Sequence, residues 1–309
     1  MRYSSSVTDA VREKIAGLKK SLNAVIVAHN YQRPEVQDIA DYVGDSLELA
    51  RRAAATDASV ILFCGVHFMA ETAHILAPRK TVLMPDPRAG CPMADMVTAE
   101  ALRALKEQHP GAPVVAYVNT SAAVKAETDV CCTSSNAVEV VSRFPGDEEL
   151  IFVPDRNLGD YVRRQTGHGH MVIWDGYCHV HNDIHPEDIV AAKEQHPDAV
   201  VMAHPECPHD VLELADVVAS TSGMLRRPET DPARSFIVAT EVGLVDRMKR
   251  LYPERTFVVA SRRAYCPNMK LTTLDKAIAA LDEGVNEITV PPAIRERALL
   301  AVERMVEVR

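Results

Sequence analysis

Three cysteines occur at nearly equal spacing along the chain, and their spacing points to a shared metal centre. Cys91, Cys178 and Cys266 lie 87 and 88 residues apart. A fixed period of this kind is typical of one supersecondary unit that is used repeatedly. Three such units around a pseudo-threefold axis would bring the thiols to one point, and thiolates are effective metal ligands. The spacing therefore favours a metal site over packing.

The residues around the cysteines repeat with the same period. Asp41, Asp129 and Asp216 occupy matching places in the three copies. A second matching set carries hydroxyl groups, namely Ser46, Ser134 and Thr221. The sequence thus predicts that each copy supplies a thiol and a hydroxyl group to a common site.

Short, continuous apolar runs alternate with helical patterns along the chain. The predicted strands are Ala24–Ala28, Val60–Cys64, Thr81–Met84, Val114–Val118, Leu150–Val153, Met171–Trp174, Ala199–Ala203, Phe236–Ala239 and Thr256–Ala260, with shorter runs at Val130–Cys131 and Val217–Ala219. Such runs are typical of parallel strands that are buried on both faces and covered by helices. We expect an α/β fold of three pseudo-threefold-related three-layer αβα units with parallel sheets, and an active site at their common interface.

The period also predicts the domain boundaries. We expect a first unit over residues 1–98, a second over 99–185 and a third over 186–272. Residues 273–309 have no counterpart in the other copies, and we expect them to pack back on the first unit as a helix (Leu274–Leu281), a short strand (Glu287–Val290) and a second helix (Pro292–Val308).

Composition excludes several classes of protein. With 47 % apolar and 25 % charged residues, the chain of 309 residues can bury a core. Its net charge of −9 argues against nucleic acid as a partner. No apolar run reaches the ~20 residues that cross a bilayer, and no signal peptide is recognisable. Seven cysteines, an odd number, argue against a disulfide framework, so we expect a cytoplasmic protein with reduced thiols.

Polar residues follow the predicted strands, at the edge where open parallel sheets bind ligands. After the first strand of each copy come His29 and Tyr31, then Tyr117, Val118 and Asn119, then His204, Pro205 and Glu206. The hydroxyl set and the cysteine loops follow other strands at the same edge. We expect these residues to line one cavity.

Packing is the alternative for every cysteine. Cys64, Cys131 and Cys132 belong to apolar runs, and Cys207 has no repeat partner, so none of them is predicted to be a ligand. Cys178, His179 and His181 form a Cys-His-x-His sequence that suggests zinc, but a structural zinc site usually has paired cysteines and a fourth ligand. Three thiolates without a fourth suit an iron–sulfur cluster with one open iron, which could act as a Lewis acid.

Several segments resemble the quinolinate synthase family over nearly the whole chain. The matching segments are Ala28–Asp41, Gly44–Ser46, Phe68–Ala73, Gly90–Met96, Tyr117–Thr120, Thr133–Val138, His204–Cys207 and Ser220–Met224. Longer members of the family carry an additional Cys-x2-Cys pair beside the third ligand. This chain has only Cys266 there, so it is similar to the short, three-cysteine form.

The resemblance implies a transferase of de novo NAD biosynthesis that condenses iminoaspartate with dihydroxyacetone phosphate to quinolinate, phosphate and water. It implies a 4Fe–4S cluster on Cys91, Cys178 and Cys266. It also implies a substrate site made by His29, Ser46, Tyr117, Val118, Asn119, Ser134, His204, Pro205, Glu206 and Thr221. Candidate catalytic residues are His29, Tyr31, Tyr117, His204 and Glu206, and His181 also occupies a family motif position. The expected partners are the two substrates and an enzyme that produces iminoaspartate.

Two other functions remain open at this point. One is a different cluster-dependent hydro-lyase that acts on a dicarboxylic acid, and the other is a non-catalytic protein that senses iron or a small anion through the same cleft. Identifying the product would distinguish a different hydro-lyase from a quinolinate synthase. Turnover after anaerobic reconstitution would exclude a non-catalytic sensor.

Overall fold

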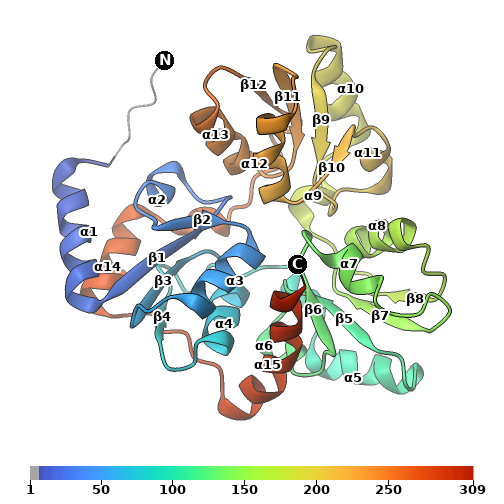
Figure 1. Ribbon diagram of the computed structural model, residues 1–309, viewed down its shortest axis with the longest axis horizontal. Helices are drawn as coiled ribbons and strands as arrows, with labels where there is room; N and C mark the ends of the chain where they lie inside the picture. Colours follow the sequence, from blue (N-terminus) through green and yellow to red (C-terminus); the bar gives the residue numbers. More distant parts are fainter. Residues whose placement is uncertain (1–6, 309) are drawn as a thin grey trace.

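The computed structural model describes residues 7–308 and contains three four-stranded parallel sheets (Figure 1). Residues 1–6 and 309, which belong to the span expected for the first unit, lie outside the described residues. The three sheets with their helices are arranged around a common centre in Figure 1. This arrangement confirms the predicted fold class.

The first sheet has the strand order β2-β1-β3-β4. Its strands are β1 (Ala24–His29), β2 (Tyr42–Gly44), β3 (Val60–Cys64) and β4 (Thr81–Leu83). The helices of this part of the chain are α1 (Asp9–Leu22), α2 (Pro34–Gln37), α3 (Ser46–Ala55), α4 (His67–Leu76) and the short 3₁₀ helix η1 (Ala94–Met96).

The second sheet repeats the same order as β6-β5-β7-β8. Its strands are β5 (Val114–Tyr117), β6 (Val130–Cys132), β7 (Leu150–Val153) and β8 (Met171–Ile173). The helices are α5 (Ala99–Gln108), α6 (Ala122–Lys125), α7 (Ala137–Val141), α8 (Arg156–Thr166) and α9 (His179–Asn182).

The third sheet has the order β10-β9-β11-β12. Its strands are β9 (Val200–Ala203), β10 (Val217–Val218), β11 (Ser235–Ala239) and β12 (Thr256–Val259). The helices are α10 (Pro186–Gln195), α11 (His209–Glu213), α12 (Thr221–Thr230), α13 (Val242–Leu251) and the 3₁₀ helix η2 (Met269–Leu271). Two further helices, α14 (Leu274–Glu283) and α15 (Pro292–Glu307), follow the third unit in the chain.

All predicted strands of the three copies form. The first and third strands of each copy along the chain are buried almost throughout, whereas β8, β10 and β12 at the sheet edges are mainly half-buried. The sequence did not predict β2, whose three residues are too short a run to stand out. The predicted strand at Glu287–Val290 is wrong. Glu287 makes only an isolated antiparallel bridge to Leu83, and Pro291 and Pro292, which lack a backbone N–H, follow at once.

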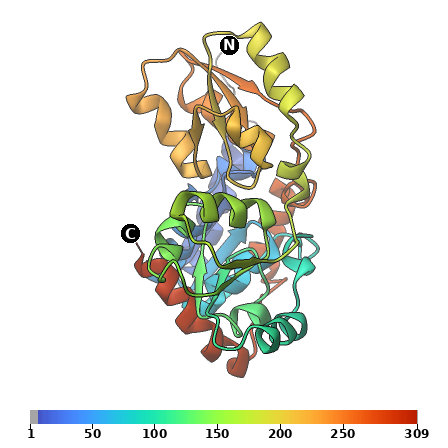
Figure 2. The same cartoon turned by 90° about the vertical axis from the view of Figure 1, so that its right-hand side faces the viewer.

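The C-terminal segment contacts more of the molecule than the sequence indicated. Helix α14 packs against α1, α2 and β3 of the first unit, but α15 contacts α6 and β6 of the second unit as well as α3 and α4 of the first. The backbone oxygen of Met305 accepts a hydrogen bond of 3.1 Å from Asn136 Nδ2. In Figure 2 the third unit, yellow to orange, lies at the opposite end of the molecule from α15, in red.

Within residues 7–308, no helix combines the length and the apolar character that crossing a membrane requires.

The repeated aspartates make the same bonds in all three units. Each carboxylate accepts a hydrogen bond of 2.8 Å from the backbone N–H of a first-strand residue, from Ile26 to Asp41, from Val114 to Asp129 and from Val201 to Asp216. Each aspartate also returns its own backbone N–H to the oxygen of that strand residue. These two hydrogen bonds connect the segment just before the second strand of each unit to the first strand of the same unit.

Removing one of these carboxylates should cost about 1 kcal/mol of unfolding free energy, the typical net value of a hydrogen bond. We expect Asp129→Ala and Asp216→Ala to lower the melting temperature by similar amounts, roughly 2–4 °C. Asp129→Asn keeps an acceptor oxygen and should recover most of the loss. Calorimetry of the three variants checks this, and an equal loss in the asparagine and alanine variants would contradict the role of the acceptor.

Candidate metal centre and substrate cavity

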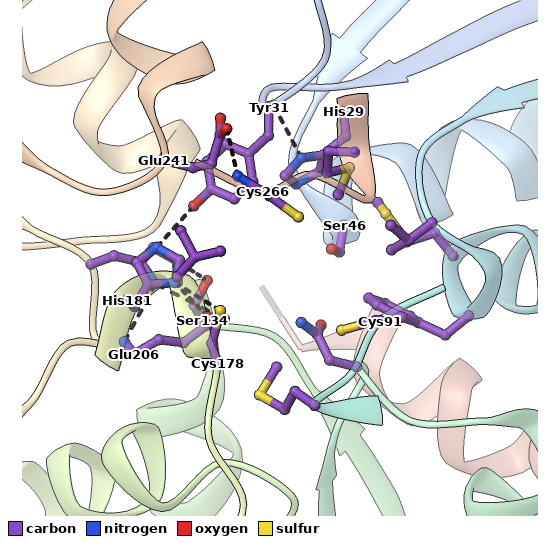
Figure 3. Close-up of a pocket in the computed structure, with 18 of the residues that line it drawn as sticks. His29, Tyr31, Ser46, Cys91, Ser134, Cys178, His181, Glu206, Glu241 and Cys266 are labelled. Carbon is purple, nitrogen blue, oxygen red and sulfur yellow. Dashed lines mark hydrogen bonds and ion pairs between the residues drawn. The ribbon is translucent and has the colours of Figure 1, made fainter. Parts of the chain in front are cut away.

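A cavity lies where the three units meet, at the carboxyl ends of their strands (Figure 3). Cys91, Cys178 and Cys266 all line it, and Figure 3 shows their sulfurs pointing into the open space from different sides. Figure 3 also shows that each cysteine comes from a different part of the chain. The equal spacing in the sequence is therefore accompanied by convergence in space.

Burial affects the ionisation of these thiols. It raises the pKa of Cys91 to about 12, and it raises the pKa of Cys178 and of Cys266 above the usual range. A coordinating metal removes the proton from a thiol, so such thiols become thiolates when a metal binds. Three soft donors that face one cavity fit an iron–sulfur group or another thiophilic metal.

The remaining cysteines lie in the packed interior. Cys64, Cys131, Cys132 and Cys207 are completely buried and do not line the cavity. Cys64 ends β3, and Cys131 and Cys132 belong to β6. Cys207 follows β9, where its Sγ lies 3.5 Å from the backbone oxygen of Ala239. All four thiols belong to the hydrophobic core, a packing role that the sequence predicted for Cys64, Cys131 and Cys132.

Two carboxylates hold the backbones of two cysteine loops, and the sequence did not single them out. Asp155 follows β7 and accepts a hydrogen bond of 3.1 Å from the Cys178 N–H. Glu241 follows β11 and accepts an equivalent bond of 3.1 Å from the Cys266 N–H. Both side chains also cap the following helix, α8 or α13. Their spacing of 86 residues, close to the repeat, is the signal that could have found them.

Two histidines occupy equivalent positions on opposite units. His29 ends β1 and its Nδ1 accepts the Tyr31 N–H at 3.2 Å, while His204 follows β9 and its Nδ1 accepts the Glu206 N–H at 3.3 Å. An accepting Nδ1 leaves the ring proton on Nε2. His204 Nε2 then donates to Ser134 Oγ at 3.2 Å. The repeated turn thus orients both imidazoles.

Both imidazoles are neutral at physiological pH. Burial lowers the pKa of His29 to about 3, and the positive charge of Lys270 also lowers it. Burial likewise lowers the pKa of His204 to about 3. Each ring can therefore donate a neutral hydrogen bond, and neither brings a positive charge to the cavity.

Glu206 lies at the centre of a buried polar cluster. Its Oε1 accepts the hydroxyl proton of Tyr117, and its Oε2 lies 2.7 Å from Nδ1 of His181. Burial alone raises the pKa of Glu206, but the imidazole of His181 and the hydrogen bonds from His181 and Tyr117 outweigh burial and hold that pKa below its usual range. Burial, together with the negative charge of Glu206, raises the pKa of Tyr117 above its usual range. The cavity therefore contains the ionised carboxylate of Glu206 beside the neutral phenol of Tyr117.

The three repeated hydroxyl groups face the cavity at the beginning of helices or just before them. Ser46 and Thr221 are the first residues of α3 and α12, and Ser134 lies shortly before α7. Helix N-termini favour anions. Thr221 Oγ1 accepts a hydrogen bond of 2.8 Å from Asn30 Nδ2, whose carbonyl oxygen in turn accepts from Arg247. Because Ser134 and Thr221 accept from neighbours, their hydroxyl protons remain available for a ligand.

Most of the predicted site residues line the cavity. These are His29, Tyr31, Ser46, Tyr117, Asn119, Ser134, His204, Glu206, Thr221 and the three cysteines. Val118 and Pro205 are buried beside it but are not lining residues, because their neighbours in the same turns carry the side chains that face inward. The carbonyl oxygen of the Asn119 side chain is buried without a hydrogen-bond partner. A bound ligand could donate a hydrogen bond to this oxygen.

The sequence did not identify the apolar part of the lining. The apolar lining residues include Val66, Phe68, Met69 and Met269. Two polar lining residues, Asp45 and Thr133, were not predicted either. Phe68 and Met69 lie in α4 within one of the family-like segments, but an apolar helix face is usually core, so nothing distinguished them from packing residues.

Cys178, His181 and Glu206 form a group of three donor atoms that could hold a metal ion.

Comparisons with known proteins agree along the whole chain. The family model described as Quinolinate synthetase A protein matches residues 13–307. A curated quinolinate synthase of Desulforudis audaxviator is 54 % identical over 300 residues, which is 97 % of this chain and 99 % of the relative. Quinolinate synthase 1 of Methanosarcina acetivorans is 53 % identical, covering 96 % of this chain and 97 % of its own. The quinolinate synthase of Thermodesulfovibrio yellowstonii is 52 % identical, with 95 % and 97 % covered.

Proposed function

The chain belongs to the Quinolinate synthetase A family, and from this membership we propose that it condenses iminoaspartate with dihydroxyacetone phosphate to form quinolinate, phosphate and water. This reaction would place it in de novo NAD biosynthesis. The observation that carries the proposal is the convergence of three evenly spaced cysteines on the cavity that the family-like segments line.

We assign a 4Fe–4S cluster to Cys91, Cys178 and Cys266. The donor set supports this assignment, since three thiols face one cavity and the other four cysteines are buried elsewhere. A cluster with three thiolate ligands leaves one iron open, and this iron would supply Lewis acidity for the loss of water. Asp155 and Glu241 hold the backbones of two of the three ligands in place.

The polar lining suits an anionic, planar product with two carboxylates. Ser46, Ser134 and Thr221 can each donate a hydrogen bond to a carboxylate, and the N-termini of α3 and α12 favour negative charge. Asn119 offers an amide that can bind a hydroxyl, imine or carboxylate. Val118 and Pro205 are buried beside these lining residues in the sequence. Positioning of two reactants in one cavity can lower a barrier by about 7–11 kcal/mol in favourable cases.

The acid–base groups of the cavity have separate roles. His29 and His204, neutral and oriented by equivalent turns, can accept protons from the reacting groups once the charge of a bound anionic substrate raises the pKa of their imidazoles. Tyr117 hydrogen-bonds to Glu206, and Tyr31 hydrogen-bonds to Thr240 Oγ1 at 2.7 Å. Each phenol can therefore exchange a proton with a substrate oxygen while its own hydrogen bond keeps it in place.

Three further points belong to the proposal. The substrate imine is unstable in water, so the protein would act beside an enzyme that produces iminoaspartate. Cluster assembly needs reduced thiols, which favours the cytoplasm. The units that supply the site would be residues 1–98 with most of 273–309, then 99–185 and 186–272.

The function is tested by anaerobic purification, with iron, sulfide and quinolinate measured on one sample. We expect quinolinate when iminoaspartate and dihydroxyacetone phosphate are both supplied, and none when either is omitted. A different product from a dicarboxylic acid would indicate another cluster-dependent hydro-lyase. Ligand binding by a reconstituted sample that never turns over would indicate an iron- or anion-sensing protein.

The hydroxyl groups should control substrate affinity without affecting the cluster. Removing a hydroxyl that donates to a carboxylate costs roughly 1.5–3 kcal/mol, so Ser46→Ala, Ser134→Ala and Thr221→Val should each lower kcat/KM about 10- to 100-fold. Iron content and cluster absorbance should stay normal, because none of the three is a ligand. Ser142→Ala, which removes an exposed hydroxyl in the same unit as Ser134, serves as the control. Near-native kinetics in two of the three site variants would contradict a shared pocket.

A further inference from the structure

Cys178 belongs to two different groups of metal-binding side chains. One is the set of three cysteines to which we assign the cluster. The other consists of Cys178, His181 and Glu206, whose donor atoms all lie within 4.8 Å of one another. His181 and Glu206 lie on the Cys178 side of the cavity, away from Cys91 (Figure 3).

The second group has nearly the dimensions of a single-ion site. His181 Nδ1 lies 3.2 Å from Cys178 Sγ and 2.7 Å from Glu206 Oε2. A tetrahedral ion with bonds of about 2.0–2.3 Å needs ligand atoms roughly 3.3–3.6 Å apart. Small side-chain rotations would therefore admit an ion. A thiolate, an imidazole and a carboxylate suit Zn²⁺, Fe²⁺ or Co²⁺ rather than Mg²⁺ or Ca²⁺.

Local structure presents these donors together. Cys178 is the N-cap of α9 and His181 lies in its single turn, so the two side chains share one face. Glu206 is held on the facing loop by Tyr117, and its backbone oxygen accepts a bond of 3.0 Å from Asn157 Nδ2.

The shell behind these donors also resembles that of a metal site. His181 Nε2 lies 2.8 Å from Thr240 Oγ1, and that threonine is completely buried. A ligating histidine commonly uses its second ring nitrogen in such a bond, which fixes the tautomer and the ring orientation. The backbone of Cys178 is held by Asp155 at 3.1 Å. The arrangement is therefore preorganised for Nδ1 coordination by His181.

We propose that the cluster-free protein binds one divalent transition-metal ion through Cys178, His181 and Glu206. On binding, the thiol of Cys178 loses its proton to solvent, and the Nδ1 proton that His181 shares with Glu206 moves to Nε2 or, where Nε2 already carries one for Thr240, to solvent. One thiolate and one carboxylate then balance the two positive charges, which leaves a neutral buried site. Since Cys178 cannot serve both groups, the ion and the cluster exclude each other, so Zn²⁺ would block cluster assembly. This last consequence rests on the cluster assignment made above, but binding of the ion does not.

The test uses Co²⁺ as a probe in the full-length, cluster-free protein under anaerobic conditions, with the fold of each variant checked by circular dichroism. We expect one equivalent of Co²⁺, thiolate-to-cobalt charge-transfer absorbance, and displacement by Zn²⁺. We expect at least about tenfold weaker binding in each of Cys178→Ser, His181→Asn and Glu206→Gln. Removing a residue that only hydrogen-bonds to a metal ligand already costs about this much, so removing a ligand should cost no less. Thr240→Val should weaken it about 10- to 100-fold.

Cys91→Ser is the matched control, because it removes a proposed cluster ligand and leaves the second group intact. It should bind Co²⁺ with wild-type affinity. Unchanged affinity in Glu206→Gln, or equal losses in Cys91→Ser and Cys178→Ser, would overturn the proposal, because the ion would then be held by the three cysteines. Quinolinate formation by the reconstituted wild type is measured separately, so failure of the proposed function and failure of the ion site can be told apart.

Discussion

Replacing Cys91, Cys178 or Cys266 with serine should remove almost all cluster iron from the anaerobically purified protein. Serine is a much poorer ligand for iron than a thiolate, and the cavity offers no further cysteine as a substitute. Iron should fall from about four ions per chain to a small residue, and quinolinate formation should fall with it. Iron and sulfide analysis together with the visible absorbance measure this loss.

Cys64→Ala and Cys207→Ala are the matched controls. Both thiols are completely buried but lie outside the cavity, so these variants should keep a full cluster and lose only some stability through a small packing defect. The ligand assignment is wrong if Cys178→Ser retains its iron, or if a folded Cys64→Ala protein loses it.

The second large effect is expected from Glu206→Gln. The glutamate is the one ionised carboxylate that faces both Tyr117 and His181, and the amide keeps its size while removing its charge. Loss of a positioned acid–base group typically costs 10²–10⁴-fold in rate. We expect kcat to fall by about that factor while cluster iron stays near wild type, because the three cysteines are intact.

Single-turnover and steady-state kinetics of Glu206→Gln should show a loss in kcat that exceeds any change in KM. Glu213→Gln, an exposed glutamate on α11 beside His209, is the control and should behave as wild type. A Glu206→Gln enzyme with near-native kcat would show that the Glu206 cluster only supports the fold.

The repeat could be recognised in the sequence because the repeated residues have local structural roles. Continuous apolar runs predict buried parallel strands, and the aspartates that recur with the period make the same backbone bonds in each unit. Local patterns failed where pairing was minimal. The three-residue strand β2 was not predicted, and the segment 287–290, in which polar and apolar residues alternate, forms only a bridge to Leu83.

The sequence by itself determined the fold class, the three cysteines and most of the cavity residues, because period and strand ends place equivalent side chains at equivalent points. Only the tertiary structure decided which elements of different units pack against each other. Helix α15 packs against the second unit as well as the first, and Glu206 of the third unit meets Tyr117 and His181 of the second. Contacts between units depend on docking geometry, which no local pattern encodes. The same geometry joins Cys178 to His181 and Glu206 and so creates a second candidate metal site.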